Sequence, residues 1–313
     1  MKLFVQIPCL NEAETLGLVL EAIPEKIKGI DSIEVLVVDD GSTDKTIEVA
    51  KAHGVKHFIR HVGNRGLARS FQEGILYGLE HGADIVVNTD GDNQYPSHQI
   101  SELVQPILSH QAEIVVGDRQ VDTIDHFSGF KKLLQKVGSR VVNIAAGTDI
   151  PDAASGFRAY SREALMQLNI MTRFSYCMET IIQAGNKQLA IVSIPITTGP
   201  KLRESRLFKS THQHVYRSAM AIIRSYVMYR PYLIFTTLGT VLLLGGSTTF
   251  VRYWILWLTG NRGGHLQSLL FGAVLLTGAF VCYMLGVLAD LTRINRILLE
   301  KNLEETRRRL YQR

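Results

Sequence analysis

The length and composition of the chain exclude several classes of protein. Its 313 residues are enough for one large domain or two ordinary ones, and 20% charged with 46% hydrophobic residues exclude a disordered chain or a fibre. Three scattered cysteines exclude a disulfide framework and a thiolate metal site. The formal charge of +5 by itself suggests nucleic acid or an anionic membrane as a partner.

The positive charge is confined to one end of the chain. Residues 1–199 hold 18 lysines and arginines against 24 acidic residues, a net charge of −6. Residues 200–313 hold 16 against 5, a net charge of +11, and the two values add up to +5. The acidic first part argues against nucleic acid as a partner, and the basic second part favours contact with a bilayer.

Residues 1–199 alternate between strand-like and helix-like segments. Short apolar runs typical of buried strands occur as LFVQI near the N-terminus and at residues 33–38, 84–89 and 113–117. Amphipathic stretches occur at residues 12–22, 43–53, 65–81 and 97–109. Helix signals accompany them: Ser42 and Thr43 as candidate N-caps, Pro96 near a helix start, and glycines at 54 and 82. This alternation predicts an α/β domain with a mostly parallel sheet and helices on both faces.

Polar residues follow three of the predicted strands: Asn11 with Glu12, Asp39 with Asp40, and Asp90 with Asp92. In sheets of this kind, ligands bind beyond the carboxyl ends of the strands. The strongest signal is Asp90-Gly91-Asp92 with Gln94, because two carboxylates at a strand end can share a hard divalent cation that also binds phosphate oxygens.

The pair Asp39-Asp40 has two interpretations. It continues as GSTDKT, so the acidic residues could belong to a helix cap, with Asp44 in the first turn. Adjacent carboxylates at the ligand edge of a sheet could instead accept hydrogen bonds from a base or a ribose.

Basic residues supply candidate anion sites. Asn64–Gly66 opens a predicted helix that contains Arg69, and its N–H groups would face a bound anion. Arg119, Arg203 and Arg206 could form bidentate bonds to a diphosphate, although each could equally be a solvated surface arginine.

Three histidines at four-residue spacing, His53, His57 and His61, suggest a metal-binding face. Gly54 and the strand-like sequence VKHFIRH interrupt any single helix that could carry all three side chains. We therefore expect no metal at these histidines.

The last third of the chain indicates a membrane anchor. Residues 208–230 form an amphipathic juxtamembrane segment, and uncharged runs of 20 and 24 residues follow at 232–251 and 266–289. They predict transmembrane helices at 231–258 and 265–290, followed by a basic cytoplasmic tail at 291–313. A buried helical hairpin is the alternative. Positive residues flank both outer ends, which places the large domain and the tail in the cytoplasm.

Five motifs occur in a characteristic order: IPCLNEAETL, VVDDGSTDKT, GNRGLARSFQEGI, NTDGDNQYP and DAASGFRAYSREAL. Together they resemble family 2 glycosyltransferases of the polyprenyl-phosphate kind, such as dolichyl-phosphate mannose synthases and bacterial undecaprenyl-phosphate glucosyltransferases. The resemblance covers residues 1 to about 210, and the two-span tail resembles that of a membrane-anchored subgroup.

The resemblance implies a GT-A, Rossmann-like three-layer domain in residues 1–207. It also implies inverting, metal-dependent transfer of one sugar from a nucleotide-sugar, a UDP- or GDP-linked hexose, to undecaprenyl or dolichyl phosphate at the cytoplasmic membrane face. The cofactor would be Mg²⁺ or Mn²⁺, and a homo-oligomer is compatible with the resemblance. The nucleotide, the sugar and the lipid length stay open.

Site residues follow from the same resemblance, position by position. The implied nucleotide-sugar ligands are Pro8, Leu10, Glu12, Val38, Asp39, Asp40, Asp90, Gly91, Arg119 and Arg203. The implied metal ligands are Asp90, Asp92 and Gln94, and the residues implied to bind the lipid phosphate are Arg203 and Arg206. Asp92, Asp152 and Arg119 are implied to be catalytic.

The expected chemistry needs little base catalysis, because a lipid monophosphate is already anionic at neutral pH. The main barrier is departure of the nucleoside diphosphate, which a cation and arginines would stabilise, with Asp152 orienting a sugar hydroxyl or the acceptor. A processive polysaccharide synthase would need a Q-x-x-R-W motif and more spans, and here Gln213 and Arg217 are four apart with no tryptophan after them. An inactive nucleotide-sugar or lipid-binding scaffold is the other alternative.

Overall fold

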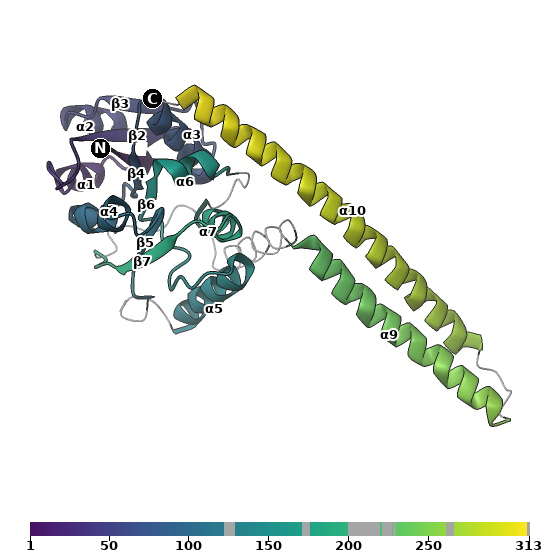
Figure 1. Cartoon of the computed structure of the whole chain (residues 1–313). Helices are drawn as coiled ribbons and strands as arrows, with labels where there is room; N and C mark the ends of the chain where they lie inside the picture. The colour runs from purple at the N-terminus through teal and green to yellow at the C-terminus, as the bar shows by residue number, and fades with distance from the viewer. Residues whose placement is uncertain are drawn as a thin grey trace. The chain divides into compact units, whose positions relative to one another are not determined.

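Figure 1 shows a computed structural model of the chain, which describes residues 1–121, 129–170, 176–199, 220, 227, 230–260 and 266–311. The chain divides into two units. The α/β unit comprises Met1–Ser225 together with Leu303–Arg313, and the helical unit comprises Tyr226–Asn302. The predicted amphipathic segment 208–230, apart from three of its positions, and both Arg203 and Arg206 lie outside the described residues.

The α/β unit is built on a seven-stranded sheet with the strand order β3-β2-β1-β4-β6-β5-β7. Strand β6 runs antiparallel to both of its neighbours, and the other pairs are parallel, as the alternating sequence pattern predicted. The strands are β1 (Lys2–Cys9), β2 (Ser32–Asp39), β3 (His57–Arg60), β4 (Ile85–Asn88), β5 (Ile114–Asp118), β6 (Arg158–Ser161) and β7 (Ile191–Pro195).

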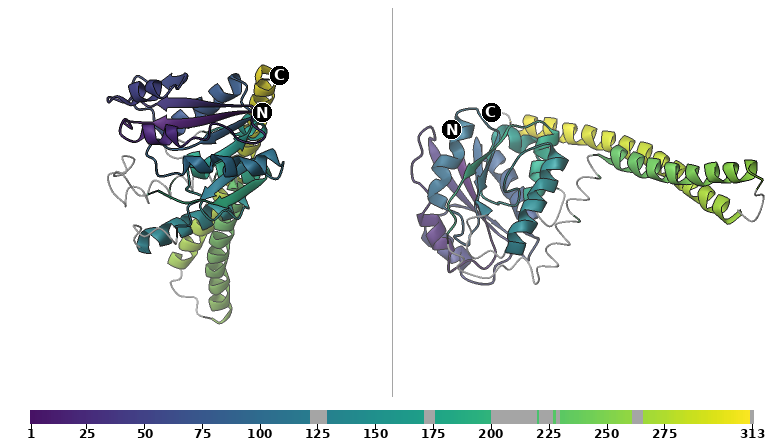
Figure 2. Two further views of the ribbon diagram at one scale, coloured as in Figure 1. Left: turned by 90° about the vertical axis from the view of Figure 1, so that its left-hand side faces the viewer. Right: turned by 90° about the horizontal axis from the view of Figure 1, so that it is seen from below.

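Helices cover both faces of this sheet (Figure 2). They are α1 (Leu16–Glu21), α2 (Thr46–Ala52), α3 (Leu67–Glu80), α4 (Ile100–Leu108), α5 (Gly129–Ala146), α6 (Arg162–Gln167) and α7 (Tyr176–Asn186), with a short 3₁₀ turn η1 (Ser97–Gln99) before α4.

Strand β1 shows why the unit has three layers. Its side chains alternate between the two faces of the sheet. Leu3, Val5 and Ile7 join the core that includes α1, α2 and α4. Phe4 and Gln6 face α3, where the Phe4 ring packs edge-on against Tyr77 and Gln6 donates a hydrogen bond to the carbonyl of Phe71. A strand buried on both faces is mostly apolar, which explains the composition of this run. Its buried polar side chain, Gln6, is held by hydrogen bonds from its amide to the carbonyl of Phe71 and to Asn88.

The start of α2 differs from the sequence-based expectation. The helix begins at Thr46, and neither Ser42 nor Thr43 caps it. The hydroxyl of Ser42 instead accepts a hydrogen bond from the N–H of Asn11 at 2.8 Å. The Asp44 carboxylate accepts the N–H of Thr46 at 3.0 Å, so the residue expected in the first turn satisfies one of the helix's free donors.

The helical unit consists of α9 (Pro231–Leu258) and the greater part of α10 (Leu266–Tyr311). Both helices are long and apolar enough to cross a membrane, with mean hydropathies of 1.6 and 2.1 over their most apolar windows. Small residues allow close packing, because a Cβ at Gly246 would lie 2.9 Å from Leu276 on the facing helix. Only 11% of the most apolar segment of α9 and 22% of that of α10 is buried, which is unlike the core of a soluble protein.

The last turns of α10 belong to the α/β unit. Arg307 is only 6% exposed and donates hydrogen bonds to the carbonyls of Leu168 at 2.6 Å and Met166 at 3.2 Å. Arg308 forms an ion pair with Glu163 on α6. The arginines therefore bind the carbonyls and a carboxylate at α6, so part of the predicted basic tail is helical and packed.

Replacement of two helix glycines by alanine should change the free energy of unfolding in opposite directions. A Cβ at Gly185 in α7 would lie 2.8 Å from the carbonyl carbon of Ala146 in α5, so Gly185→Ala should lower the free energy of unfolding by about 2 kcal/mol. Gly138 in α5 has no heavy atom within 4 Å of such a Cβ, so Gly138→Ala should raise it by about 0.5–1 kcal/mol. Denaturant unfolding of the full chain in micelles measures both, and equal effects would contradict the packing of α5 on α7.

Candidate active site

Three loops at the carboxyl edge of the sheet are tied to one another. The hydroxyl of Thr15, after β1, donates to the carbonyl of Gly91, after β4, at 2.7 Å. The N–H of Glu12 donates to the hydroxyl of Thr46, after β2, at 2.8 Å. A Cβ at Gly91 would lie 3.1 Å from Glu12, so Gly91 allows the first and third loops to approach closely. The structure thus brings together the three polar clusters that the sequence placed after separate strands.

The loop after β4 offers hard oxygen ligands. The Asp92 carboxylate accepts hydrogen bonds from the backbone N–H of Gln94 at 3.2 Å and from its side-chain amide at 2.8 Å. Within the described part of the chain, no group of three or more His, Cys, Asp or Glu residues could hold a metal ion. A six-coordinate cation here would therefore take at most two carboxylates and an amide oxygen from the protein, and its other ligands from a diphosphate or water.

Arg119 and Asp152 form a buried, bidentate ion pair. Nε and Nη2 of Arg119, directly after β5, donate to the two carboxylate oxygens of Asp152 at 2.6 and 2.9 Å. Asp152 is 1% exposed. Burial alone would raise the pKa of this carboxyl, but the charge and hydrogen bonds of Arg119 outweigh burial and hold the pKa below its usual range.

A second buried arginine, Arg158, shapes the loop that carries Asp152. Its guanidinium donates to the carbonyls of Ser155 at 2.7 Å, Ala153 at 2.9 Å and Cys177 at 2.7 Å, and to the hydroxyl of Thr180. Arg158 is fully buried. The sequence predicted no role for Arg158, which occurs there only as one arginine of the motif DAASGFRAYSREAL.

Tyr95 and Asn88 connect the Asp90 loop with the Asp152 loop. The hydroxyl of Tyr95 accepts the N–H of Gly156 at 2.8 Å, and the amide of Asn88 donates to the carbonyl of Gly156 at 3.1 Å. A Cβ at Gly156 would lie 3.5 Å from a carboxylate oxygen of Asp90. Acidic residues from two distant motifs therefore lie at one site.

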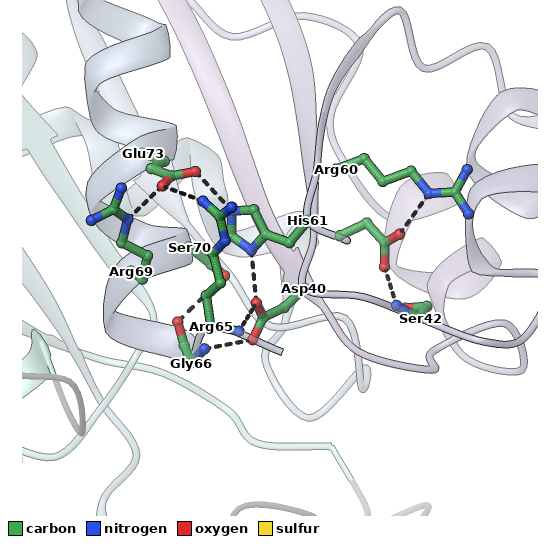
Figure 3. A network of polar contacts seen from close by, with 10 residues as sticks. Asp40, Ser42, Arg60, His61, Arg65, Gly66, Arg69, Ser70 and Glu73 are labelled. Carbon is green, nitrogen blue, oxygen red and sulfur yellow. Dashed lines mark hydrogen bonds and ion pairs between the residues drawn. The ribbon is translucent and has the colours of Figure 1, made fainter. Parts of the chain in front are cut away.

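Asp40 binds the loop that opens α3 (Figure 3). Its carboxylate accepts the backbone N–H groups of Arg65 at 2.7 Å and Gly66 at 2.9 Å. The sequence predicted that these N–H groups would face a bound anion, and the structure shows that the anion is the protein's own Asp40. Asp39 is likewise engaged: it accepts the N–H of Ser42 at 2.9 Å and lies 3.6 Å from Nε of Arg60.

His61 bridges two carboxylates in the same network. Its Nδ1 lies 2.7 Å from Asp40 Oδ1, and its Nε2 lies 2.7 Å from Glu73 Oε2 (Figure 3). A protonated ring nitrogen can donate to the carboxylate that it faces, so the imidazole links Asp40 with Glu73. Burial alone would raise the pKa of Glu73, but hydrogen bonds from Arg69 and His61 lower it below its usual value. The sequence analysis considered His61 only as a metal ligand and rejected that role. The sequence did not show that His61 lies beside the DDGS motif, because the fold brings the two together.

The other predicted ligands line the same edge of the sheet. Pro8 and Val38 are register partners on β1 and β2, and both are buried. Leu10 and Glu12 follow β1, and Glu12 is 6% exposed.

Comparisons with known proteins agree with this geometry. The family model described as glycosyl transferase family 2 matches residues 4–168, just over half of the chain. The chain belongs to glycosyl transferase family 2. It is therefore a glycosyltransferase, as its motifs predicted.

Curated relatives of this glycosyltransferase include two lipid-phosphate enzymes by name. The dolichol-phosphate mannosyltransferase of Pyrococcus furiosus is 32% identical over 231 residues, which cover 69% of this chain and 63% of the relative. The undecaprenyl-phosphate mannosyltransferase of Micrococcus luteus is 27% identical over 211 residues, which cover 63% of this chain and 83% of the relative.

Among solved structures, glucosyl-3-phosphoglycerate synthase of Mycobacterium tuberculosis, crystallised with Mn²⁺ and UDP, aligns with a TM-score of 0.53 and 22% identity. The alignment covers 72% of this glycosyltransferase and 78% of that chain. The α/β unit has the GT-A fold expected from the sequence, with a mostly parallel seven-stranded sheet.

Removal of the Asp152 carboxylate should destabilise the glycosyltransferase in a pH-dependent way. Asp152→Asn leaves Arg119 without its buried partner and should lower the free energy of unfolding by about 3 kcal/mol at neutral pH. Because the folded-state pKa of Asp152 is lowered, the stabilisation is present above the unfolded-state pKa of about 4 and is lost as pH falls through the folded-state value.

The measurement is denaturant unfolding in micelles, followed by circular dichroism from neutral pH downward. Asp149→Asn is the matched control, since Asp149 is exposed and lies three residues earlier. A difference between Asp152→Asn and the unmutated protein that persisted unchanged at the lowest pH would contradict the ion pair.

Loss of the His61 imidazole should also destabilise the α/β unit. His61→Gln leaves the carboxylates of Asp40 and Glu73 with a single neutral amide between them, and should lower the free energy of unfolding by about 2 kcal/mol. His53→Gln serves as control, because the partner of His53, Glu21, is 68% exposed and the change should cost less than about 0.5 kcal/mol. Equal effects of the two substitutions in thermal and denaturant unfolding would contradict the bridge from Asp40 through His61 to Glu73.

Proposed function

We propose that this glycosyltransferase transfers a single sugar from a nucleotide-sugar to a polyprenyl phosphate. The observation that carries the proposal is the convergence of the Asp90–Gln94 loop and the Arg119–Asp152 pair, joined through Tyr95, in a chain that also has two candidate membrane spans. The names of the relatives from Pyrococcus furiosus and Micrococcus luteus, both polyprenol-type phosphate mannosyltransferases, support this acceptor class.

The donor diphosphate is assigned to the edge formed by the loops after β1, β2 and β4. Asp90, Asp92 and Gln94 would hold Mg²⁺ or Mn²⁺, and their hard oxygen atoms suit either cation. When bound, the cation would offset charge on the leaving diphosphate. The structural neighbour crystallised with Mn²⁺ and UDP supports this donor class.

Arg119 supplies a positive charge whose position is fixed before the substrates bind. Asp152 holds the guanidinium through two hydrogen bonds, so little reorganisation is needed when negative charge develops on the leaving group. The lowered pKa of Asp152 makes it a poor proton acceptor near neutral pH. In this proposal Asp152 therefore positions Arg119 and does not act as a general base.

The acceptor phosphate would attack the anomeric carbon directly. A phosphate monoester needs little activation by a base, and one displacement without a covalent enzyme intermediate inverts the anomeric configuration. Arg203 would contact phosphates of donor or acceptor, and Arg206 the lipid phosphate. The basic flanks of both candidate spans favour placement of the α/β unit and the C-terminus on the cytoplasmic side.

The nucleotide pocket would be lined by Pro8, Leu10, Glu12 and Val38, with Gly91 allowing the loops to close around it. Asp39 and Asp40 would form its wall. Because both carboxylates already accept hydrogen bonds from the protein, they would contact a base or ribose only through an oxygen lone pair that the protein leaves accessible.

The test uses the purified full chain in detergent with Mg²⁺ or Mn²⁺, radiolabelled UDP- and GDP-sugars, and undecaprenyl or dolichyl phosphate. We expect a lipid that carries one sugar with inverted anomeric configuration, and no product after chelation of the metal. Asp92→Asn should lower kcat/KM by about a hundredfold or more. Asp31→Asn, an identical exchange at a side chain that is 90% exposed, should leave it unchanged.

Three results would contradict the proposal. A labelled polymer would identify a processive synthase. Saturable nucleotide-sugar binding without product from any donor would identify a binding scaffold. Full turnover by Asp92→Asn would remove the acidic loop from the mechanism.

A further inference from the structure

Three side chains hold the backbone of Gly156 from both sides. The N–H of Gly156 donates to the hydroxyl of Tyr95 at 2.8 Å. Its carbonyl accepts the amide of Asn88 at 3.1 Å and the hydroxyl of Tyr176 at 3.2 Å. A Cβ at this position would lie 3.1 Å from the Tyr176 hydroxyl, so glycine lets the three side chains close around the backbone. Gly156 is therefore fixed by residues of β4, of the loop after β4 and of α7 together.

Tyr95 reaches this glycine from the acidic loop, Asp90–Gln94. It directly follows Gln94 and is only 6% exposed. Its ring stacks on that of Phe157, with the ring centroids 5.5 Å apart and the planes 13° from parallel. The carbonyl of Phe157 in turn accepts the N–H of Gly117 on β5 at 2.9 Å, two residues before Arg119. The side chain of Tyr95 thus contacts the segment that leads into β6 and, through it, the strand that ends before Arg119.

Gly156 also follows directly on the turn that carries Asp152. The N–H of Ser155 donates to the carbonyl of Asp152 at 3.3 Å, and the N–H of Ala154 donates to Asp152 Oδ1 at 3.3 Å. Asp152 then holds the guanidinium of Arg119 through two hydrogen bonds. Because buried, close-packed segments open and shift as cooperative units, a displacement of the Gly156 backbone would be passed to Asp152 and from there to Arg119.

The Tyr95 hydroxyl lies among the charged groups of the site. A Cβ at Gly156 would be 3.5 Å from this hydroxyl and 3.5 Å from a carboxylate oxygen of Asp90. Burial raises the pKa of Tyr95, and the charges of Arg119, Asp90 and Asp152 also act on that pKa. A hydrogen bond in such a buried place is costly to remove without a replacement, because the N–H left behind is cut off from water. The hydrogen bond from the Gly156 backbone to the residue after the acidic loop therefore depends on one hydroxyl group.

We infer that Tyr95 is a positioning residue that couples occupation of the acidic loop by the donor to the placement of Arg119. The inference rests on the proposed function and adds to it a route, which runs from the acidic loop through the Tyr95 hydroxyl and the Gly156 backbone to the Arg119–Asp152 pair. A nucleoside diphosphate bound at the acidic loop would restrict that loop, and Tyr95 would restrict the Asp152 turn with it. Arg119 would then be held most firmly when the leaving group that it stabilises is present.

Removal of one hydroxyl tests the coupling in the full chain. Tyr95→Phe keeps the buried ring and its contact with Phe157, and should lower kcat by about tenfold while the donor KM changes less than about twofold. Tyr77→Phe is the matched control, because the Tyr77 hydroxyl lies 2.9 Å from Nδ1 of His57 on β3, and it should leave kcat unchanged. Equal kcat for Tyr95→Phe and the unmutated protein, with or without a rise in the donor KM, would overturn the inference.

A second substitution shows whether Tyr95 acts through Arg119. Arg119→Lys keeps the positive charge but loses the bidentate geometry that Asp152 imposes. If Tyr95 positions Arg119, adding Tyr95→Phe to Arg119→Lys should lower kcat by less than about twofold further, since contacts within one network are not additive. A purely structural role of Tyr95 would give the full tenfold fall in both backgrounds, and that result would contradict the inference.

Hydrogen exchange tests the coupling without any turnover. The full chain in micelles is diluted into deuterated water with Mn²⁺ and UDP, with Mn²⁺ and GDP, or with Mn²⁺ alone, and peptides that span Asp152–Phe157 are analysed by mass spectrometry. The nucleoside diphosphate that binds should slow exchange in this segment by about fivefold or more in the unmutated protein and in Tyr77→Phe. In Tyr95→Phe, calorimetry should still detect binding, but the segment should exchange at its ligand-free rate.

Equal protection in Tyr95→Phe and in the unmutated protein would overturn the coupling, as would a lack of protection in the unmutated protein despite measured binding. Absence of binding by either diphosphate would contradict both the coupling and the proposed function. If the unmutated protein bound a diphosphate but formed no lipid-linked sugar from any donor, the proposed function would be wrong. The exchange experiment would still decide whether Tyr95 links the acidic loop to Asp152.

Discussion

The bidentate ion pair between Arg119 and Asp152 joins parts of the molecule that are distant in the sequence. Arg119 directly follows β5, and Asp152 lies in the loop before β6, the one strand of the described sheet that runs antiparallel to its neighbours. Both partners would be costly to bury alone, so each stabilises the position of the other. Around this pair, Arg158 binds the loop carbonyls and Tyr95 connects the loop to Asp90. The geometry of the candidate site therefore depends on a buried pair of opposite charges, Arg119 and Asp152.

A second buried polar network, around Asp40, fixes the loop that opens α3. Asp40 accepts the N–H groups at the start of α3, and the His61 ring lies between Asp40 and Glu73 in contact with both carboxylates. A helix N-terminus attracts anions whatever their source, so a carboxylate of the chain competes there with any ligand. Here the Asp40 carboxylate binds these N–H groups and fixes the loop that precedes α3. In the proposed function, the electrostatic stabilisation of a diphosphate would therefore come from a cation held by the Asp90–Gln94 loop and from Arg119.

Helix α5 shows how the loop that carries Asp152 is held in place. Its residues Ser139 and Asn143 bind the backbone on either side of Asp152. The position of the Arg119–Asp152 pair therefore depends on a helix that contributes no side chain to the pair itself.

The sequence alone determined the class of fold, the edge of the sheet that forms the site and the family. Alternating apolar runs and amphipathic stretches depend on local periodicity, and the acidic motifs follow their strands directly, so neither required a tertiary structure. Strand β3 lies within the strand-like sequence VKHFIRH, whereas β6 and β7 were not predicted, because they are short and include Arg158 and Pro195, which interrupt an apolar pattern. The partners of charged residues were also inaccessible to the sequence. Arg119 with Asp152, Asp40 with His61, and Arg307 with the carbonyls after α6 are 33, 21 and about 140 positions apart. Only the folded chain decides which charges are buried together, because the energy of a buried charge depends on neighbours that the fold, and not the order of residues, brings into contact.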